Sequence, residues 1–255
     1  MAKKKIIVGN WKMNPPTLEE AERLFSGIVG LTSKVKKTEI VICPPFVYLA
    51  RLQKLSRKIS LGAQDDFYET TGPFTGEISA EMLYNLGIKY VILGHSERRS
   101  LGESNADINK KIKASLSVGL RPIVCVGEKE RDEKHGYFNV VKEQIKECLV
   151  GVNKNLISEI IFAYEPVWAL STTANRHDAT SSDSNEMTIF IRKILSDISS
   201  PKIAGSVSII YGGSVTEKDA RDFLENGGVS GLLPGRASLN TEKFAEIISI
   251  AEHSS

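Results

Sequence analysis

Short apolar runs alternate along the chain with longer segments in which apolar residues recur at helical spacing. The runs have the length and composition of strands that are buried on both faces. Such alternation is typical of βαβ units, which build a parallel sheet. The predicted strands are residues 6–9, 40–43, 59–63, 90–93, 122–126, 160–164, 207–211 and 231–233.

Each predicted strand is followed by a helix candidate. Thr17 and Glu20 predict a capping box, in which the hydroxyl and the carboxylate satisfy opposite backbone amides, and Thr216 with Asp219 predicts a similar cap. Residues 171–185 are polar and predict a long loop inside one unit. The apolar stripes predicted to face the core are Leu18, Ala21, Leu24, Phe25 and Ile28; Ile108, Ile112 and Leu116; Val141, Ile145 and Leu149; Met187, Phe190, Ile191, Ile194 and Ile198; Phe223 and Leu224; and Phe244, Ile247 and Ile248.

Eight strand-helix units in 255 residues predict the α/β class and a closed (β/α)8 barrel, which commonly takes about 250 residues. We expect a single domain over residues 1–255, because no linker or change in composition divides the chain. An open, doubly wound sheet is the alternative architecture. In both architectures ligands bind at the carboxyl ends of the strands, and we look for functional residues there.

Charge and cysteine content narrow the function. The 33 basic and 31 acidic residues give a net charge of +2, which predicts neither a nucleic-acid nor a membrane partner. The apolar run after Lys3, Lys4 and Lys5 is too short for a signal peptide or a membrane span. Three widely spaced cysteines predict no disulfide framework, and the four histidines show no ligand spacing that would predict a metal site. A cytoplasmic protein fits this composition best.

Several chemically capable residues follow the predicted strands. Glu165 ends the sixth strand, where Pro166 stops the sheet ladder and apolar residues beside the carboxylate exclude water, as suits a general base. Asn10 and Lys12 follow the first strand and are placed to bind an anionic or carbonyl-bearing ligand. His95 follows the fourth predicted strand. Taken singly, each has a plainer explanation: an acid that begins a loop, an exposed lysine, a structural histidine.

Glycine-rich turns follow the seventh and eighth strands, Y-G-G-S-V at residues 211–215 and G-L-L-P-G-R-A-S at residues 231–238. Glycine lets the backbone approach a ligand closely, and the loops after strands seven and eight of such barrels often bind phosphate. Two tight turns without a ligand are the alternative. The chain lacks G-x-x-x-x-G-K-[ST], and has no well-placed G-x-G-x-x-G, so a nucleotide is not predicted. A small phosphorylated metabolite is predicted instead.

Six ordered stretches show that the chain resembles the triosephosphate isomerase family over nearly its whole length. They are V-G-N-W-K-M-N at residues 8–14, F-T-G-E-I-S at 74–79, G-H-S-E-R-R at 94–99, C-V-G-E at 125–128, A-Y-E-P-V-W-A at 163–169 and Y-G-G-S-V at 211–215. The resemblance implies the reversible conversion of dihydroxyacetone phosphate to glyceraldehyde 3-phosphate through an enediolate. It also implies a cytoplasmic homodimer of glycolysis and gluconeogenesis that uses no cofactor.

The resemblance also implies roles for the matching residues. Glu165 would be the base that moves the proton, His95 the electrophile that polarises the carbonyl, and Lys12 and Asn10 the groups that bind substrate and stabilise the enediolate. Glu97 would hold the Lys12 side chain in position. Phosphate would be bound by the amides of Ser171, Ser214, Gly235 and Arg236, and Asn14 and Thr75 would lie at the dimer interface, Thr75 on a long loop over residues 64–76 that enters the partner.

The stretch after residue 169 departs most from the family, which usually has G-T-G-K in its lid. Residues 170–180 read L-S-T-T-A-N-R-H-D-A-T, without those glycines or that lysine and about three residues longer. We expect an intact catalytic centre with altered closure of the lid over residues 171–180, because a lid must exclude water and hold the intermediate. This departure also supports an alternative function, a phosphosugar-binding barrel without turnover. Smaller departures are Arg236 in place of a glycine, Asp65 in place of an asparagine, and a shorter turn at residues 99–103.

Overall fold

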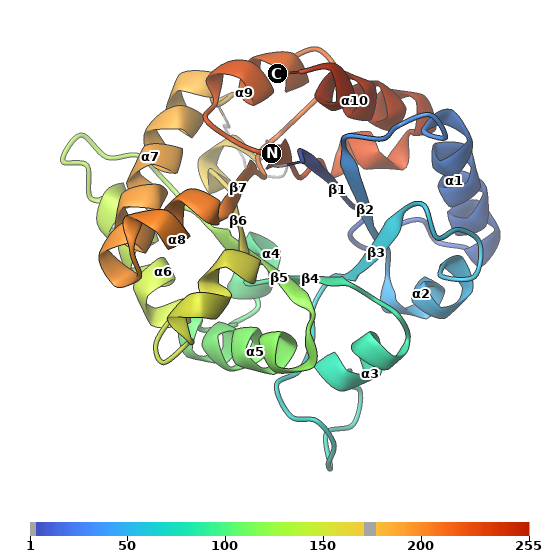
Figure 1. The fold of residues 1–255 in the computed structure, drawn as a ribbon, viewed down its shortest axis with the longest axis horizontal. Coiled ribbons are helices and arrows are strands. Elements are labelled where there is room, and N and C mark those ends of the chain that lie inside the picture. Colours follow the sequence, from blue (N-terminus) through green and yellow to red (C-terminus); the bar gives the residue numbers. More distant parts are fainter. Residues whose placement is uncertain (1–3, 171–176, 255) are drawn as a thin grey trace.

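The computed structural model describes residues 4–170 and 177–254. In this part of the chain eight parallel strands form a barrel in chain order, and helices surround it as a ring (Figure 1). The strands are β1 (Ile6–Asn10), β2 (Glu39–Cys43), β3 (Ser60–Ala63), β4 (Tyr90–Leu93), β5 (Arg121–Val126), β6 (Ile161–Tyr164), β7 (Ser208–Tyr211) and β8 (Gly231–Leu232). The α-helices are α1 (Leu18–Leu31), α2 (Phe46–Leu52), α3 (Ala80–Asn85), α4 (Ser96–Ser100), α5 (Asn105–Val118), α6 (Tyr137–Cys148), α7 (Ser181–Ile198), α8 (Pro201–Ser206), α9 (Ala220–Asn226) and α10 (Thr241–His253). Three 3₁₀ helices are η1 (Lys154–Glu159), η2 (Val167–Ala169) and η3 (Arg236–Leu239).

The barrel closes where β8 pairs with β1, with Ile6 opposite Gly231 and Ile7 opposite Leu232. A Cβ atom on Gly231 would lie 1.9 Å from the Ile6 carbonyl oxygen, so only glycine allows the two strands to approach this closely. The predicted (β/α)8 barrel is confirmed and the open sheet is wrong. Every predicted strand agrees with the structure to within one residue at each end.

Two layers of apolar side chains build the core. One fills the barrel interior and includes Val8, Val41, Ile92 and Ile210. The other lies between the strands and the helix ring, where the predicted stripes of α5, α6, α7 and α10 are buried or partly buried. Burial on both faces of the sheet explains why the strands are continuously apolar in sequence.

The start of α1 agrees only in part with its prediction. The Thr17 hydroxyl accepts a hydrogen bond from the Glu20 amide at 3.2 Å, but the reciprocal bond of the predicted capping box is not formed. Leu18 was predicted to face the core and is 43 % exposed. It is the first residue of the helix, ahead of the buried positions Ala21, Phe25 and Ile28.

Two other predictions of helix starts are wrong. Thr216 does not cap a helix: the Asp219 carboxylate accepts from the Thr216 amide at 2.7 Å within a turn, and α9 begins after it at Ala220. The predicted loop over residues 171–185 ends early, because α7 begins at Ser181. Thr180 and Asp183 form a complete capping box there. This first turn is polar because it packs through hydrogen bonds, with the buried Ser184 hydroxyl donating to the Gly227 carbonyl at 3.0 Å.

Candidate active site

The barrel brings the predicted rim residues to one end. Asn10 is the last residue of β1, His95 follows β4 by two residues, and Glu165 follows β6 directly. Asn10, His95 and Glu165 are all buried, between 2 % and 6 % exposed. Residues from strands far apart in sequence therefore meet at the carboxyl ends of the sheet, where ligands of such barrels bind.

The Glu165 carboxylate is held at the barrel mouth by a backbone donor. Its Oε2 atom accepts a hydrogen bond from the Ser96 amide at 3.0 Å. Its Oε1 atom lies 3.1 Å from the Nε2 atom of His95, yet the geometry is not that of a hydrogen bond, and Oε1 has no hydrogen-bond partner among the described residues. A buried carboxylate oxygen without a donor is costly for the fold. The carboxylate is therefore well placed to accept a proton from a ligand.

Two glycines fit closely around Glu165. A Cβ atom on Gly127 would lie 1.8 Å from the Glu165 carbonyl oxygen, and one on Gly212 would lie 3.0 Å from Glu165 Cγ. Hydrogen bonds on either side extend the pairing of β5 and β6 past the strand ends: the Glu165 amide donates to Val126 at 2.8 Å and the Val167 amide to Glu128 at 3.0 Å. The backbone of Glu165 is thus fixed on both sides.

His95 is the N-cap residue of α4, and its ring is oriented by that helix. The Nδ1 atom accepts a hydrogen bond from the Glu97 amide at 3.2 Å. A ring nitrogen that accepts carries no proton, so this partner assigns a neutral imidazole with its proton on Nε2, the nitrogen that faces Glu165. His95 can therefore donate a hydrogen bond to an oxygen without being a strong acid.

Lys12 has a left-handed backbone conformation, with φ of 51°, which is uncommon outside glycine. Its amide donates to Asn10 Oδ1 at 3.0 Å, and its carbonyl accepts from Gln64 Nε2 at 2.8 Å. These two bonds hold the strained residue in place. The ammonium pairs with Glu97 Oε1 at 2.6 Å. Asn10 thus orients the lysine backbone, while Glu97 orients its charge.

A cavity of about 630 Å³ opens beside these residues. Its walls include Lys12 and His95 together with the loops after β7 and β8. Those loops contribute Ser214 and Gly235, and Arg236 and Lys243 bring further positive charge. A Cβ atom on Gly213 would lie 2.2 Å from the Tyr211 hydroxyl, so this turn needs glycine. Ser171, the remaining predicted phosphate ligand, lies outside the described residues.

Sequence reasoning missed three residues that build this site: Ser96, Gln64 and Glu128. The buried Glu128 carboxylate accepts from the Tyr164 hydroxyl and the Trp168 indole, both at 2.8 Å, through its Oε1 atom. It thereby joins the strand that carries the base to the helix that follows it. The stretch C-V-G-E contained a signal for Glu128, but nothing in the sequence shows which side chains it meets.

Within the described ranges, no group of three or more histidine, cysteine or acidic side chains is placed to hold a metal ion. In the same ranges no helix combines the length and apolar character needed to cross a membrane. Cys43, Cys125 and Cys148 are buried free thiols.

A neutral imidazole and an ammonium beside one cavity, with a buried carboxylate 3.1 Å from the imidazole, define a barrel equipped for proton transfer on a small anionic ligand. Comparison with known proteins identifies the family. The family model described as Triosephosphate isomerase matches residues 5–251. The triosephosphate isomerase of Aquifex aeolicus is 43 % identical over 96 % of this chain and 98 % of its own length. That of Dictyoglomus thermophilum is 42 % identical over 96 % of this chain and 99 % of its own length. The chain belongs to the triosephosphate isomerase family.

Proposed function

We propose that the protein interconverts dihydroxyacetone phosphate and glyceraldehyde 3-phosphate by proton transfer through an enediolate. The observation that supports this most directly is the Glu165 carboxylate 3.1 Å from the Nε2 atom of a neutral His95, beside a cavity that contains the Lys12 ammonium. Family membership and the names of the relatives support the same reaction. The activity belongs to an intramolecular aldose-ketose isomerase.

In this proposal Glu165 removes a proton from the carbon next to the carbonyl, and the electron pair of that C–H bond forms the enediolate double bond. His95 donates from Nε2 to the carbonyl oxygen, where negative charge develops, and Lys12 and Asn10 stabilise the same charge. The proton then returns from Glu165 to the neighbouring carbon, the former carbonyl oxygen keeps a proton as a hydroxyl, and the hydroxyl of the first carbon loses its proton as the new C=O bond forms. No electron leaves the substrate, so the step balances without a redox partner.

The phosphate group would lie in the part of the cavity formed by the loops after β7 and β8. We propose that the amides of Ser171, Ser214, Gly235 and Arg236 bind it. The Arg236 side chain is exposed and has no ion pair with another described residue. Where relatives usually carry glycine, it adds a guanidinium that attracts a dianionic substrate. Lid closure over residues 171–180 would differ from that of relatives, and solvent-viscosity and phosphate-elimination assays measure it.

We propose a homodimer in which the loop over residues 64–76, with Thr75, and the neighbourhood of Asn14 contact the partner. The loop after β3 projects from the barrel (Figure 1). Large apolar side chains remain exposed nearby: Met13 is 92 % exposed, and Phe74 is 39 % exposed. Exposed apolar groups of this size are typical of an interface. The proposed setting is the cytoplasm, in glycolysis and gluconeogenesis.

A coupled assay of glyceraldehyde 3-phosphate isomerisation tests the function. Wild type should turn over, Glu165→Gln should lose at least about a thousandfold in kcat because an amide cannot accept the proton, and the exposed control Glu143→Gln should match wild type. Equal rates for wild type and Glu165→Gln would overturn the mechanism. A wild-type protein that binds substrate but does not convert it would favour the alternative of a phosphosugar-binding barrel.

A further inference from the structure

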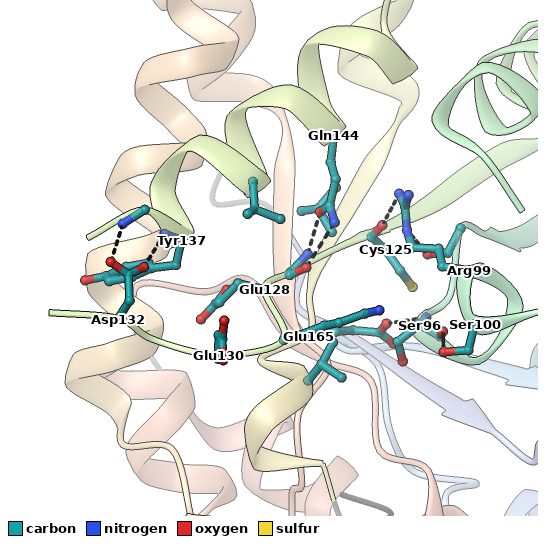
Figure 2. Close-up of a pocket in the computed structure, with 17 residues that line it drawn as sticks. Ser96, Arg99, Ser100, Cys125, Glu128, Glu130, Asp132, Tyr137, Gln144 and Glu165 are labelled. Carbon is teal, nitrogen blue, oxygen red and sulfur yellow. Dashed lines mark hydrogen bonds between the residues drawn. The ribbon is translucent and has the colours of Figure 1, made fainter. Parts of the chain in front are cut away.

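A second cavity, of about 320 Å³, lies on the other side of Glu165, and it shares no described residue with the first. It is bounded by the start of α4, the segment after β5 and the start of α6. Figure 2 shows Ser96 and Arg99 on one side of it, Asp132 and Tyr137 on the other, and Glu128 and Glu165 between them. In this structure the catalytic base therefore lines the second cavity, while Lys12 and His95 line the first.

Three buried oxygen atoms of residues that line this cavity lack hydrogen-bond partners among the described residues. They are Glu165 Oε1, Glu128 Oε2 and Ser96 Oγ. Glu165 and Glu128 are 2 % and 1 % exposed, and Ser96 is 9 % exposed. Buried acceptors without donors are costly, and a ligand that donates hydrogen bonds would relieve that cost.

The charge of the lining favours a cation. Four carboxylates belong to it, those of Glu128, Glu130, Asp132 and Glu165, against the two cations of Arg99 and Lys129 among the described lining residues. Glu128 Oε1 also pairs with the Arg131 guanidinium at 3.3 Å, so the excess of negative charge rests on the other carboxylates. The Arg99 guanidinium is already engaged, since it donates to the carbonyl oxygens of Gly94 and Cys125. An anion would meet a net negative surface, while a small cation would find charged partners.

The walls are preformed and partly apolar. Gln144 from α6 donates to the Gly127 carbonyl at 3.0 Å and accepts from the Gly127 amide at 2.8 Å, as Figure 2 shows. Val126, Val140 and Val167 supply apolar surface. A cavity of about 150 Å³ is enough for benzene, so this one accommodates a one-ring ligand with a polar substituent. Pockets that bind small molecules commonly combine such walls with a few polar groups.

We propose that the second cavity binds a small organic cation that carries N–H donors, of the arylamidinium class, and that such a ligand inhibits the enzyme by holding Glu165 on Ser96. The amidinium pairs with the carboxylates of Glu165 and Glu128 while its ring lies against the valines. This inhibition rests on the proposed function, since it requires that Glu165 act as the base. Binding itself does not depend on it.

The inhibition follows from a difference between two positions of the base. To reach a substrate in the first cavity, Glu165 must give up its contact with the Ser96 amide and turn away from the second cavity. A cation bound in the second cavity pairs with the carboxylate only before that movement. The bound cation therefore shifts the population of Glu165 side chains toward the inactive position. The size of the shift is set by the ratio of the cation's affinities for the two positions of Glu165. Substrate would not displace it directly, because the cavities are separate.

Benzamidine is the probe, and calorimetry and steady-state kinetics are the two readouts. We expect one site per chain with a Kd on the order of 1 mM, as suits so small a ligand, and a fall in kcat that saturating substrate does not reverse. Phenyltrimethylammonium, a cation without N–H donors, should bind at least about tenfold more weakly. Benzoate should not bind in this cavity.

Val140→Phe tests the location, because Val140 is 43 % exposed on α6 and a ring at that position would fill the cavity. The variant should keep the ligand-free kcat and lose at least about tenfold in benzamidine affinity. Val150→Phe, at an exposed position outside the cavity, should match wild type. Glu130→Gln removes one negative charge at the rim and should weaken benzamidine binding about threefold. This variant tests the location if Val140→Phe does not fold.

Three results would overturn the proposal: no binding of benzamidine at about 10 mM, unchanged affinity in both Val140→Phe and Glu130→Gln, or inhibition that only raises KM. A protein without isomerase activity in the absence of ligand would instead contradict the proposed function. In that case calorimetry with the same variants still decides whether the cavity binds the cation.

Discussion

A single added methyl group at Gly127 should disable the catalytic base. The Cβ atom of Gly127→Ala would lie 1.8 Å from the Glu165 carbonyl oxygen and 2.6 Å from its carbonyl carbon. Both are backbone atoms, so no side chain can rotate away to make room. Since Cβ contacts below 3.0 Å essentially do not occur, the two segments must separate by at least 1.2 Å, the difference between 3.0 and 1.8 Å.

That separation acts directly on the carboxylate. The Glu165 amide and the Val167 amide are bonded to the segment that carries Gly127, at 2.8 and 3.0 Å, so the displacement cannot be absorbed on one side alone. A misplacement of about 1 Å costs roughly a hundredfold in rate when reacting groups must be aligned. Overpacking costs about 1 to 3 kcal/mol of stability in addition. We expect Gly127→Ala to lower kcat about a hundredfold, with a smaller change in KM.

The assay is the coupled isomerase reaction at saturating substrate, with urea unfolding in parallel at fixed protein concentration. Gly30→Ala is the matched control, because a Cβ atom at Gly30 in α1 meets nothing within 4 Å. It should keep full activity and gain about 0.5 to 1 kcal/mol from better helix propensity. Activity of Gly127→Ala within twofold of wild type would refute the argument that this contact positions the base.

Three further predictions concern stability, pH and substrate binding. Glu128→Gln should lower the free energy of unfolding by about 2 kcal/mol in urea titrations, because charged hydrogen bonds to Tyr164 and Trp168 become neutral ones, whereas an unchanged midpoint would contradict it. Burial raises the pKa of Asp66 to about 7, so its neutral form stabilises the fold below about pH 4 and that stabilisation is lost as the pH rises through 7. Asp66→Asn should therefore gain up to about 4 kcal/mol relative to wild type between pH 4 and 7, measured by urea unfolding at each pH, and a constant difference would disprove the assignment. Arg236→Gly should raise KM about threefold at low salt with kcat unchanged, Arg236→Lys should be milder, and equal KM values would show that the guanidinium does not contact the phosphate region.

The barrel itself could be predicted because its strands are buried on both faces. Their apolar runs are continuous, and the polar turns that bound them fix each end to within a residue. The starts of the helices were harder to predict than the strands. The stretch at Thr180 has the threonine and acid spacing of a cap, yet its first turn is polar because Ser184 packs by a hydrogen bond to Gly227. The stretch at Thr216 has the same spacing and forms only a turn. Local spacing does not distinguish these two outcomes.

The candidate site likewise contains residues that could be predicted from the sequence and residues that could not. Side chains at strand ends, such as Lys12 and Glu165, could be found because the end of a parallel strand faces the ligand side of the barrel. The Ser96 amide could not be found, since every residue carries one and only the fold aims it at the base. The role of Gln64 depends on the left-handed conformation of Lys12, which no local pattern in the sequence signals.

One short segment organises all the reacting groups. Ser96, the first residue of α4, gives its amide to the carboxylate of Glu165, and the next amide, of Glu97, fixes the tautomer of His95. The Glu97 side chain pairs with the Lys12 ammonium. Base, electrophile and cation, which follow three different strands, are therefore contacted by two consecutive residues, Ser96 and Glu97. Since two of these contacts use backbone amides of the same helix start, a change that unwinds α4 should disturb base and imidazole together, whereas loss of the Glu97 carboxylate should disturb the lysine alone.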